Sequence, residues 1–398
     1  MGGRFWASLA GAGAVLGIWA GAPASAAPAA AGVVAAAVPS QHDLHSVSCT
    51  GPKSCVAVGV NAAVDHGNGA VLAETWHGTR WTVDVMKPPS GSLGSTLSGI
   101  SCVSARSCVA VGYYLYDLPD HNTRDVGFAE FWNGAVWKLV KLAQPARVSA
   151  LPEAVSCVSA KTCVAVGEMF APGNQFAFAE TWNGTAWKMT TVPEPADTIS
   201  NLTGVSCTSP KFCIAVDAYN PRALVQSWNG RSWKIVKVPA PASTGPSLSA
   251  VTCLTAKFCV ATGMHYPNPK HFSAIALSWN GRAWKGASVP SPGPGYANLA
   301  SVSCATARSC LAVGEYHFGV YLDSGKQYAA SWNGKAWKLV RLPAPPGAGR
   351  GKGSSLTGVK CVSATDCVAV GSAGAAGSTA TSYSAFWNGR GWKFIRFA

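Results

Sequence analysis

The stretch LSGISCVSARSCVAVG, residues 97–112, decides the fold, because its pattern occurs seven times in the 398-residue chain. Each copy holds two cysteines separated by five residues. A Trp-Asn-Gly segment, or Trp-His-Gly in one copy, follows it, with a second tryptophan five residues after the first. First cysteines recur at intervals of 46 to 57 residues. The sequence therefore predicts seven copies of one unit, at residues 44–96, 97–151, 152–201, 202–247, 248–298, 299–355 and 356–398.

The second unit indicates what one copy can form. Residues 97–102 alternate apolar and polar side chains and residues 108–112 are rich in valine, and both patterns are typical of strands. Residues 127–132 and 137–142 predict two more strands, joined by the hairpin turn that Asn133 and Gly134 favour. Four short strands repeated about every 50 residues are typical of a propeller blade. We therefore expect an all-β, seven-bladed β-propeller of four-stranded antiparallel blades.

The fourteen cysteines are expected to form one disulfide in each blade. An even number at regular spacing indicates disulfides in an oxidising compartment. A spacing of six requires a three- or five-residue loop before the two cysteines can face each other across a hairpin. Closing such a loop stabilises the chain by roughly 2 kcal/mol. The expected pairs are Cys49/Cys55, Cys102/Cys108, Cys157/Cys163, Cys207/Cys213, Cys253/Cys259, Cys304/Cys310 and Cys361/Cys367.

Metal binding is the alternative use of these cysteines. The spacing lacks the close C-x2-4-C clustering of zinc sites, and no histidine recurs with it. We expect no metal and no cofactor.

The N-terminal residues predict export. Residues 1–26 combine one basic residue, Arg4, with an apolar stretch and the ending Ala24-Ser25-Ala26, which is the layout of a secretory signal peptide. A retained anchor is the alternative, but a membrane span needs about 20 apolar residues and this stretch is short and broken by glycines. Residues 27–43 are rich in alanine and proline and predict a linker; whether residues 30–40 add a strand is left open. We expect a monomer that is extracellular or wall-associated, without a membrane span after cleavage.

Three recurring motifs carry a family resemblance over residues 44–398. The succession L-x-x-V-S-C, C-V-A-V-G and W-N-G-x-x-W-K resembles the repeats of secreted bacterial propellers related to the sialidase-type Asp-box (BNR-like) family. The resemblance implies propeller architecture and carbohydrate or protein binding. Asparagine stands where the Asp-box has its turn aspartate, and the arginine cluster and nucleophile of sialidases have no matching positions. The resemblance therefore supplies no catalytic residue.

The first and third turns of an antiparallel four-stranded blade lie on one face of the ring, and the second turns lie on the other. Among the first and third turns the only carboxylate is Asp366, so the first face is expected to be strongly basic. Such a face attracts polyanions over about 8 Å at physiological salt, which favours anionic cell-envelope polymers over nucleic acid as partners. Solvated turn residues without a partner are the alternative. The basic first-turn residues are Lys53, Arg106, Lys161, Lys211, Lys257 and Arg308.

The second-turn loops collect tyrosines and carboxylates. Aromatic rings beside hydrogen-bonding carboxylates are suited to sugars or peptide segments, and variable loops on a rigid scaffold commonly carry binding. The alternative is that the aromatic rings pack on one another to order the loops. Asp217 stands out because glycine occupies its position in the other six units. The predicted ligand-binding residues are Tyr113, Tyr114, Tyr116, Glu168, Asp217, Tyr219, Tyr266, Glu315 and Tyr316.

These observations favour a secreted, non-catalytic binding protein whose loop face engages a glycan or an extracellular protein. One alternative is a glycan-cleaving hydrolase or lyase that uses Glu168, Asp217 and Glu315, which requires those carboxylates to meet in one cleft. A second alternative is a structural envelope protein held by charge. The tryptophan pairs are expected to pack between neighbouring blades.

Overall fold

The structure is a computed structural model. It describes residues 42–62, 69–84, 86–118, 123–145, 148–171, 173–195, 200–217, 223–238, 246–268, 271–318, 325–346, 352–375 and 381–397. The expected signal peptide, nearly all of the linker and the undecided residues 30–40 lie outside the described residues. Within the described part of the chain, no helix has the length and apolar character needed to cross a membrane.

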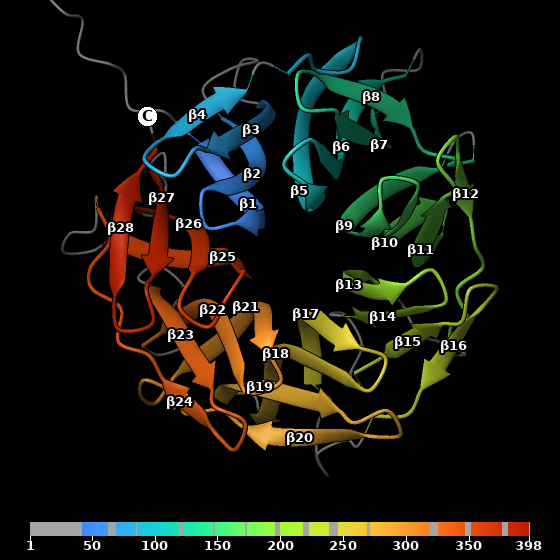
Figure 1. Cartoon of the computed structure of the whole chain (residues 1–398). Helices are drawn as coiled ribbons and strands as arrows, with labels where there is room; N and C mark the ends of the chain where they lie inside the picture. The colour runs from blue at the N-terminus through green and yellow to red at the C-terminus, as the bar shows by residue number, and fades with distance from the viewer. Residues whose placement is uncertain are drawn as a thin grey trace, which may run out of the picture. The chain divides into compact units, whose positions relative to one another are not determined.

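The described residues form 28 β-strands, in seven sets of four consecutive antiparallel strands that we number units 1 to 7 (Figure 1). Units 1 to 3 comprise β1 (His42–Gly51), β2 (Ser54–Asn61), β3 (Ala70–Trp76), β4 (Trp81–Asp84), β5 (Ser92–Ser104), β6 (Ser107–Asp117), β7 (Thr123–Trp132), β8 (Trp137–Lys141), β9 (Ser149–Ser159), β10 (Thr162–Ala171), β11 (Asn174–Trp182) and β12 (Trp187–Met189). Units 4 and 5 comprise β13 (Leu202–Ser209), β14 (Phe212–Asp217), β15 (Val225–Trp228), β16 (Trp233–Val236), β17 (Pro246–Thr255), β18 (Phe258–Asn268), β19 (His271–Trp279) and β20 (Trp284–Ser288). Units 6 and 7 comprise β21 (Tyr296–Thr306), β22 (Ser309–His317), β23 (Lys326–Trp332), β24 (Trp337–Leu339), β25 (Lys352–Cys361), β26 (Cys367–Ala375), β27 (Thr381–Trp387) and β28 (Trp392–Arg396).

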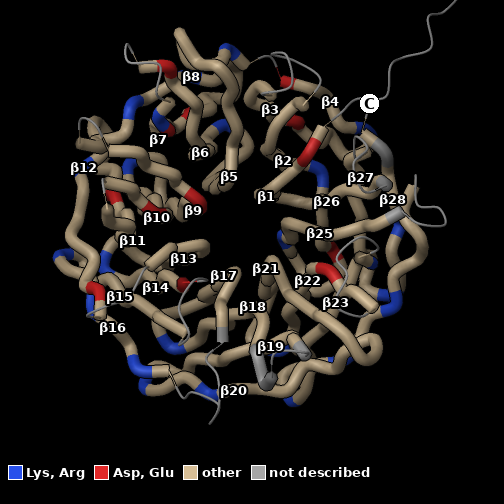
Figure 2. Tube along the Cα trace, turned by 180° about the vertical axis from the view of Figure 1, so that it is seen from behind, with Lys and Arg blue, Asp and Glu red and all other residues tan. Residues whose placement is uncertain are grey.

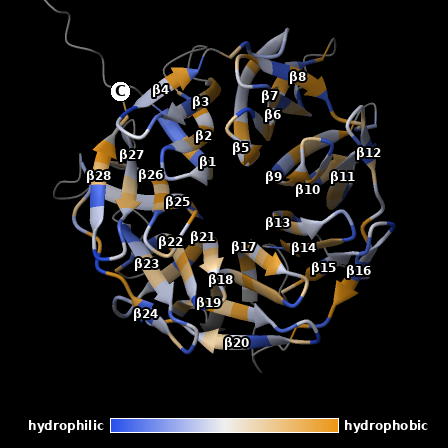
Figure 3. Ribbon diagram, in the orientation of Figure 1, coloured by the Kyte–Doolittle hydropathy of each residue, from blue (hydrophilic) through white to orange (hydrophobic). Residues whose placement is uncertain are grey.

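The units are arranged around a central opening, with the first strand of each unit innermost and the fourth outermost (Figure 1). Unit 7 contacts unit 1, because Thr357 Oγ1 donates a hydrogen bond to Leu44 O at 2.6 Å and Trp81 Nε1 donates one to Ser384 Oγ at 2.9 Å. Apolar residues concentrate on the strands and hydrophilic residues on the turns (Figure 3). This architecture confirms the expected all-β propeller of four-stranded antiparallel sheets.

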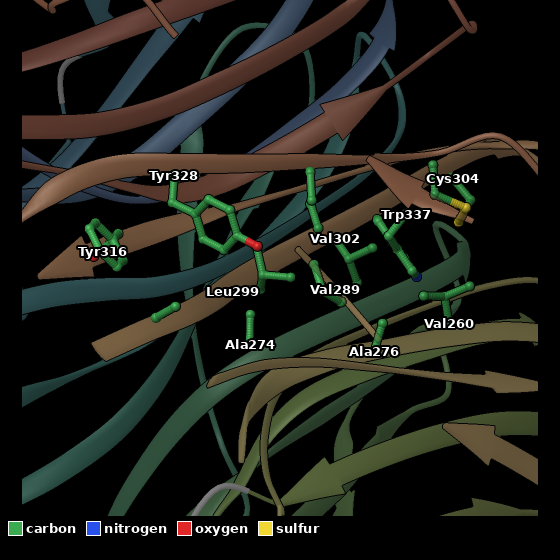
Figure 4. Packing of buried hydrophobic residues seen from close by; sticks show 14 residues of the cluster. Val260, Ala274, Ala276, Val289, Leu299, Val302, Cys304, Tyr316, Tyr328 and Trp337 are labelled. Atoms are coloured by element: carbon green, nitrogen blue, oxygen red, sulfur yellow. A yellow bond between two sulfur atoms is a disulfide. The ribbon is translucent and has the colours of Figure 1, made fainter. Parts of the chain in front are cut away.

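The motif L-x-x-V-S-C lies on the innermost strands, and its leucine and valine form the core between units. Both positions are buried throughout, for example Leu97, which is fully buried, and Ile100, which is 7% exposed. One such inter-unit core joins units 5 and 6 and includes Leu299, Val302 and Trp337 (Figure 4). The periodic apolar positions are therefore explained by packing.

The residue after the leucine forms a β-bulge in every innermost strand, where strand pairing skips one residue. Several bulged side chains reach the neighbouring unit: Thr203 Oγ1 donates a hydrogen bond to Leu248 O at 2.9 Å. The next residue is always Gly, Ala or Ser. A Cβ added to Gly204 would lie 3.2 Å from the Cα of Ala250, so a small residue allows neighbouring innermost strands to approach closely. The seven bulged residues are His45, Ser98, Glu153, Thr203, Ser249, Ala300 and Thr357.

The serine before the first cysteine links one unit to the next. Ser101 Oγ accepts a hydrogen bond from the backbone N–H of Cys157 at 3.0 Å. Ser48, Ser156, Ser206 and Ser303 make the same bond to the following unit, at 2.9 to 3.0 Å. The repeated serine therefore satisfies a backbone donor at the boundary between units, which a buried N–H requires.

Each unit contains a cross-strand row of two cysteines and two tryptophans, such as Cys102, Cys108, Trp132 and Trp137. All seven predicted disulfides are present: Cys49–Cys55, Cys102–Cys108, Cys157–Cys163, Cys207–Cys213, Cys253–Cys259, Cys304–Cys310 and Cys361–Cys367. The predicted three- or five-residue loop is wrong for the hairpin of unit 2. There Ser104 pairs with Ser107 across a two-residue turn, and a β-bulge beside Cys102 supplies the even spacing.

The disulfides are framework bonds, as predicted, and their second cysteines belong to the core. The second cysteine of every pair lies on the second strand of its unit, between the first cysteine on one side and the first tryptophan on the other, as Cys163 lies between Cys157 and Trp182. Neighbours on both sides leave these side chains at most 3% exposed, so no ligand can reach them. They are framework residues: Cys55, Cys108, Cys163, Cys213, Cys259, Cys310 and Cys367.

The first cysteines are covered less evenly, because each lies on the innermost strand. Three of them are buried as well, namely Cys49, Cys304 and Cys361. The other four, Cys102, Cys157, Cys207 and Cys253, are partly exposed. All are bonded to their partners, and the described part of the chain holds no free cysteine.

The tryptophans pack within and between units, as predicted. The centroids of the paired indoles lie 5.5 to 5.8 Å apart. Phe386 of unit 7 packs on Trp76 of unit 1 at 4.5 Å, and Phe131 of unit 2 packs on Trp182 of unit 3 at 4.7 Å. Trp132 Nε1 donates a hydrogen bond to Ala105 O in the disulfide turn, which ties the first and third turns together.

Candidate functional site

A cavity of about 800 Å³ lies at the centre of the ring, lined by residues from all seven innermost strands. Its inner part is lined mainly by valines, an isoleucine and small residues. Towards the loop face, where the second turns lie, the lining changes character. There His45, Tyr113, Asp125 and Glu153 contribute groups that can bond or carry charge. We call this end of the cavity the mouth.

The bulged residues explain how polar side chains enter this cavity, because all seven of them line it. Five are Ser, Thr or Ala. The other two are His45 in unit 1 and Glu153 in unit 3, which lie on either side of unit 2, the unit that provides Tyr113 and Asp125. The ionisable groups of the mouth therefore gather over units 1 to 3.

His45 is held by contacts on both ring nitrogens. Nδ1 bonds with Leu97 O at 2.9 Å, and Nε2 lies 3.8 Å from Oδ2 of Asp43. Burial lowers the pKa of this imidazole, but bonding to Asp43, its charge and the Leu97 carbonyl outweigh burial, so the pKa lies above its ordinary value. His45 is the described histidine that lines the mouth.

Glu153 is the most strongly perturbed carboxylate of the mouth. Burial raises its pKa to about 7, the charge of Glu168 adds to the rise, and His45 opposes it. Burial also raises the pKa of Asp125 and of Glu168; Gln175 Nε2 donates a 2.5 Å hydrogen bond to Glu168 and moderates the rise there. These carboxylates share one poorly solvated region.

Among the described residues, no lysine or arginine contributes to the raised pKa values of these carboxyl groups. Over the described ranges, every ion pair within 4 Å uses a histidine. The same part of the chain holds no group of three or more His, Cys, Asp or Glu side chains arranged for a metal ion. The mouth therefore combines acceptors with one imidazole and one phenol, Tyr113, whose pKa rises through burial and through the charges of Glu153, Asp125 and Glu168.

Two predicted ligand residues lie at this mouth. Tyr113 lines the cavity, and Glu168 acts electrostatically on Glu153 and on Tyr113. Tyr114, on the other side of the same strand, packs against Phe128 at 5.9 Å. Tyr116 is 37% exposed near the loop. Unit 2 thus presents two of its three predicted tyrosines to solvent or cavity.

The other predicted tyrosines lie elsewhere. Tyr316 is 1% exposed in the core between units 5 and 6, and its hydroxyl donates a 2.6 Å hydrogen bond to Pro294 O (Figure 4). Tyr328, also buried in that core, donates to Pro290 O. Tyr219 and the side chain of Tyr266 lie outside the described residues. Part of the aromatic signal in the sequence therefore reports loop packing, as the alternative interpretation held.

None of the three carboxylates of the glycan-cleaving alternative is among the described residues that line the central cavity. Asp217 is fully buried, whereas Glu315 is one-third exposed and lies 3.4 Å from His317 Nε2. The carboxylates that line the cavity are instead Asp125 and Glu153.

Asp217 is accommodated by a local change in its unit. In the other six units glycine is required here, because an added Cβ would lie about 2.0 Å from a carbonyl oxygen of the innermost strand. Strand pairing in unit 4 begins only at Leu202, which lies opposite Asp217. The residue before Leu202 is therefore not held against Asp217 by strand hydrogen bonds. Asp217 therefore reflects a shortened strand.

Sequence reasoning missed His45, Asp125 and Glu153. The available signal was the second position of L-x-x-V-S-C, where His45 and Glu153 replace the Ser, Thr or Ala of other units. Only the bulge, which turns this position towards the cavity, gives that difference its meaning. Asp125 lies on β7 opposite Leu115 and no motif marks it.

The opposite face carries the predicted basic turns. All six first-turn residues, Lys53, Arg106, Lys161, Lys211, Lys257 and Arg308, are exposed. Each lies against the third-turn glycine of its unit: a Cβ added to Gly134 would lie 2.6 Å from Cγ of Arg106. Gly134 has φ +94°, and Asn133 Oδ1 accepts two backbone hydrogen bonds that fix the turn. Lys and Arg positions recur around the outer part of the ring (Figure 2).

Comparisons with known proteins support the fold alone. No protein-family model and no curated protein sequence matches the chain. The GH74 enzyme of Niastella koreensis is similar with TM-score 0.55 and 10% identity, over 90% of this chain and 54% of that one, so the chain spans about half its length. A PL25 ulvan lyase bound to -[GlcA(1-4)Rha3S]- gives TM-score 0.53 and 7% identity over 90% and 97% of the two chains. YCF48 bound to D1 peptide gives 0.50 and 10% over 91% and 93%. The propeller is confirmed, and the relation to Asp-box repeats stays a prediction.

Proposed function

We propose that this chain is a secreted, non-catalytic binding protein: a closed seven-bladed propeller that engages an extracellular partner at the mouth of its central cavity. Closure is supported by the hydrogen bonds and ring contacts between units 7 and 1. Seven disulfides fit an oxidising, extracellular setting. The observation that carries the proposal is the gathering of His45, Tyr113, Asp125 and Glu153 at one end of the cavity.

A segment of an extracellular protein suits this mouth better than a glycan. Sugar binding commonly uses exposed aromatic rings, and among the predicted tyrosines whose side chains the structure describes, only Tyr113 and Tyr116 face the mouth or solvent. The carboxylates would repel an anionic glycan. Among similar folds, YCF48 is bound to a peptide and the ulvan lyase to a glycan, so the choice of a peptide rests on the residues of the mouth. A neutral glycan remains the second ligand class of the proposal.

A second candidate function is docking of the basic face on an anionic envelope polymer. It is favoured by the first-turn cations, whose aliphatic stems rest on the third-turn glycines, for example Lys161 on Gly184. This arrangement limits the freedom of each stem while leaving the charge in water. The two functions use opposite faces and are compatible in one molecule. Glycan cleavage is less favoured, because none of Glu168, Asp217 and Glu315 is among the described residues that line the central cavity and Asp217 is fully buried.

The test is a screen of the mature, oxidised protein against peptide, neutral-glycan and anionic-polymer arrays, at low salt and at about 0.5 M salt, where screening acts within roughly 4 Å. Two variants accompany it: Tyr113→Ala at the mouth, and Lys161→Ala with Lys211→Ala and Lys257→Ala on the basic face. Salt-resistant binding that only Tyr113→Ala removes supports the mouth. Binding that only salt and the lysine variant remove transfers the function to the basic face, and cleaved products contradict the non-catalytic assignment.

A further inference from the structure

The strand register gives the order in which residues line the mouth, from the loop face inward. On β6, Leu115 pairs across from Asp125 and Tyr113 pairs across from Thr96, while the bulged residues lie next to Gly112. Leu115 is therefore about three residues, or roughly 10 Å, further out than the bulge layer. A ligand that enters from the loop face meets Leu115 and Asp125 first, then Tyr113, and then Glu153 in the bulge layer.

The walls of this entry are partly apolar. Val60 and Leu115 line the cavity near the rim, and Val155 and Ile100 line it below the bulge layer. A neutral polar chain would lose hydrogen bonds to water against these walls. A flexible aliphatic stem would lose none. The lining is therefore compatible with a side chain that has an apolar stem and carries its polar group at the end.

The layer that such a side chain reaches is rich in carboxyl groups. Asp125 and Glu153 line the cavity, Glu168 acts on Glu153, and within the described part of the chain no lysine or arginine contributes to the pKa of any of them. His45 faces Glu153 as well, but its Nδ1 is engaged by Leu97 O and its other nitrogen lies beside Asp43. Among the described residues that line the mouth, the carboxyl groups consequently outnumber the cations. A positively charged group would relieve their mutual repulsion and their poor solvation.

We propose that the mouth binds a lysine or arginine side chain of the partner, with the aliphatic stem passing Leu115 and Tyr113 and the cationic head beside Glu153 and Asp125. This inference rests on the proposed function, since it names the chemistry of the ligand at the same site. The net charge of +14 works against unspecific adsorption of a cation. Binding of a basic peptide to this protein is therefore informative about the mouth.

The experiment uses capped five-residue peptides that differ only at the central residue: lysine, arginine, N-acetyl-lysine or norleucine, with alanine elsewhere. Affinities are measured at neutral pH by ligand-observed NMR and calorimetry on the oxidised protein. N-acetyl-lysine keeps the stem and removes the charge. We expect the lysine and arginine peptides to bind at least about tenfold more tightly than the two neutral ones, about 1.4 kcal/mol.

The variant Glu153→Gln keeps the size of the side chain and removes its charge, and Glu315→Gln makes the same change outside the cavity. Glu153→Gln should abolish the preference for lysine over N-acetyl-lysine, and Glu315→Gln should retain it. Equal binding of lysine and N-acetyl-lysine to the natural protein, absence of binding by the lysine peptide, or an unchanged preference in Glu153→Gln each overturns the inference. Thermal unfolding of both variants establishes that they are folded.

Failure of this inference is distinguishable from failure of the proposed function. If the array screen finds a peptide or neutral glycan whose binding depends on Tyr113 but not on a basic group, the mouth is the binding site. The proposal that it binds a lysine or arginine side chain is then wrong. If no ligand depends on Tyr113, the proposed function fails with it.

Discussion

Replacing the buried Glu130 by glutamine should make the protein more stable at alkaline pH and leave it unchanged in acid. Glu130 lies on β7, two residues before Trp132, and is 2% exposed. Its Oε2 has no hydrogen-bond partner within the described residues, and burial raises its pKa to about 7. Unit 4 has Gln226 at the equivalent position, fully buried, with its amide donating to Pro193 O at 2.6 Å. The chain itself therefore uses the substituted residue in this environment.

The sign of the expected stability change follows from the direction in which folding shifts the pKa of Glu130. A carboxyl whose pKa is raised by folding binds its proton more tightly in the folded state. Its contribution is fully present below the ordinary pKa of 4.5 and is lost as pH rises through about 7. The difference between 4.5 and about 7 corresponds to about 3 kcal/mol at most. For a protein of this size that is roughly 4 °C in Tm.

The assay is thermal unfolding of oxidised natural protein and of Glu130→Gln between about pH 4 and pH 8, the window that brackets the shift. Tryptophan fluorescence reports unfolding, and Glu315→Gln at a partly exposed site is the matched control. The two proteins should coincide near pH 4 and separate progressively to pH 8, with Glu130→Gln the more stable. Parallel curves, or a difference that shrinks as pH rises, would refute the reasoning that Glu130 is buried without compensation.

Three further predictions concern the repeated framework. Removing one disulfide by Cys207→Ala with Cys213→Ala should cost roughly 2 kcal/mol through loop entropy, read as a lower denaturation midpoint; no change under oxidising conditions would contradict the entropic account. Ser101→Ala leaves the N–H of Cys157 without its acceptor and should cost about 1 to 3 kcal/mol, whereas Ser98→Ala, at the bulge of the same strand, should cost much less; equal losses would show that the inter-unit bond is unimportant. Gly167→Ala would place a Cβ 2.0 Å from Leu151 O and should destabilise by more than about 3 kcal/mol, while Gly51→Ala, with no atom near the added Cβ, should stay within about 0.5 kcal/mol; a tolerated Gly167→Ala would mean that β9 yields easily.

The fold was accessible from the sequence because its determinants are local and repeated. The cysteine pair, the tryptophan pair and the turn of each unit lie within about 40 residues of one another. Seven copies of the unit therefore predict the same hairpins seven times. The β-bulges were not accessible. A spacing of six is produced equally by a longer loop or by a bulge beside a two-residue turn, and only strand register distinguishes them.

The candidate site was predicted only in part, for a related reason. Tyr113 and Tyr114 are adjacent in sequence and equally aromatic, yet alternation along β6 directs one to the cavity and the other onto Phe128. Tyr316 looked like a binding residue because loop composition does not reveal that Pro294 O accepts its hydroxyl in the core. His45 and Glu153 come from units 1 and 3, and their proximity depends on ring geometry that no local pattern encodes.

The bulge position is where such a ring can change its chemistry at least structural cost. The leucine, the small residue, the valine and the serine of L-x-x-V-S-C each contact a neighbouring unit, so replacing them disturbs packing or a backbone bond. The bulged side chain instead faces the cavity, and Ser, Thr, Ala, His and Glu all occur there. His45 and Glu153 flank unit 2, and Asp125 and Glu168 lie on the same side of the ring. The ionisable groups of the mouth are therefore concentrated on units 1 to 3, although the backbone repeats seven times. A partner bound at the mouth should therefore contact units 1 to 3 and leave units 5 and 6 free, so Glu153→Gln should weaken binding while Glu315→Gln does not.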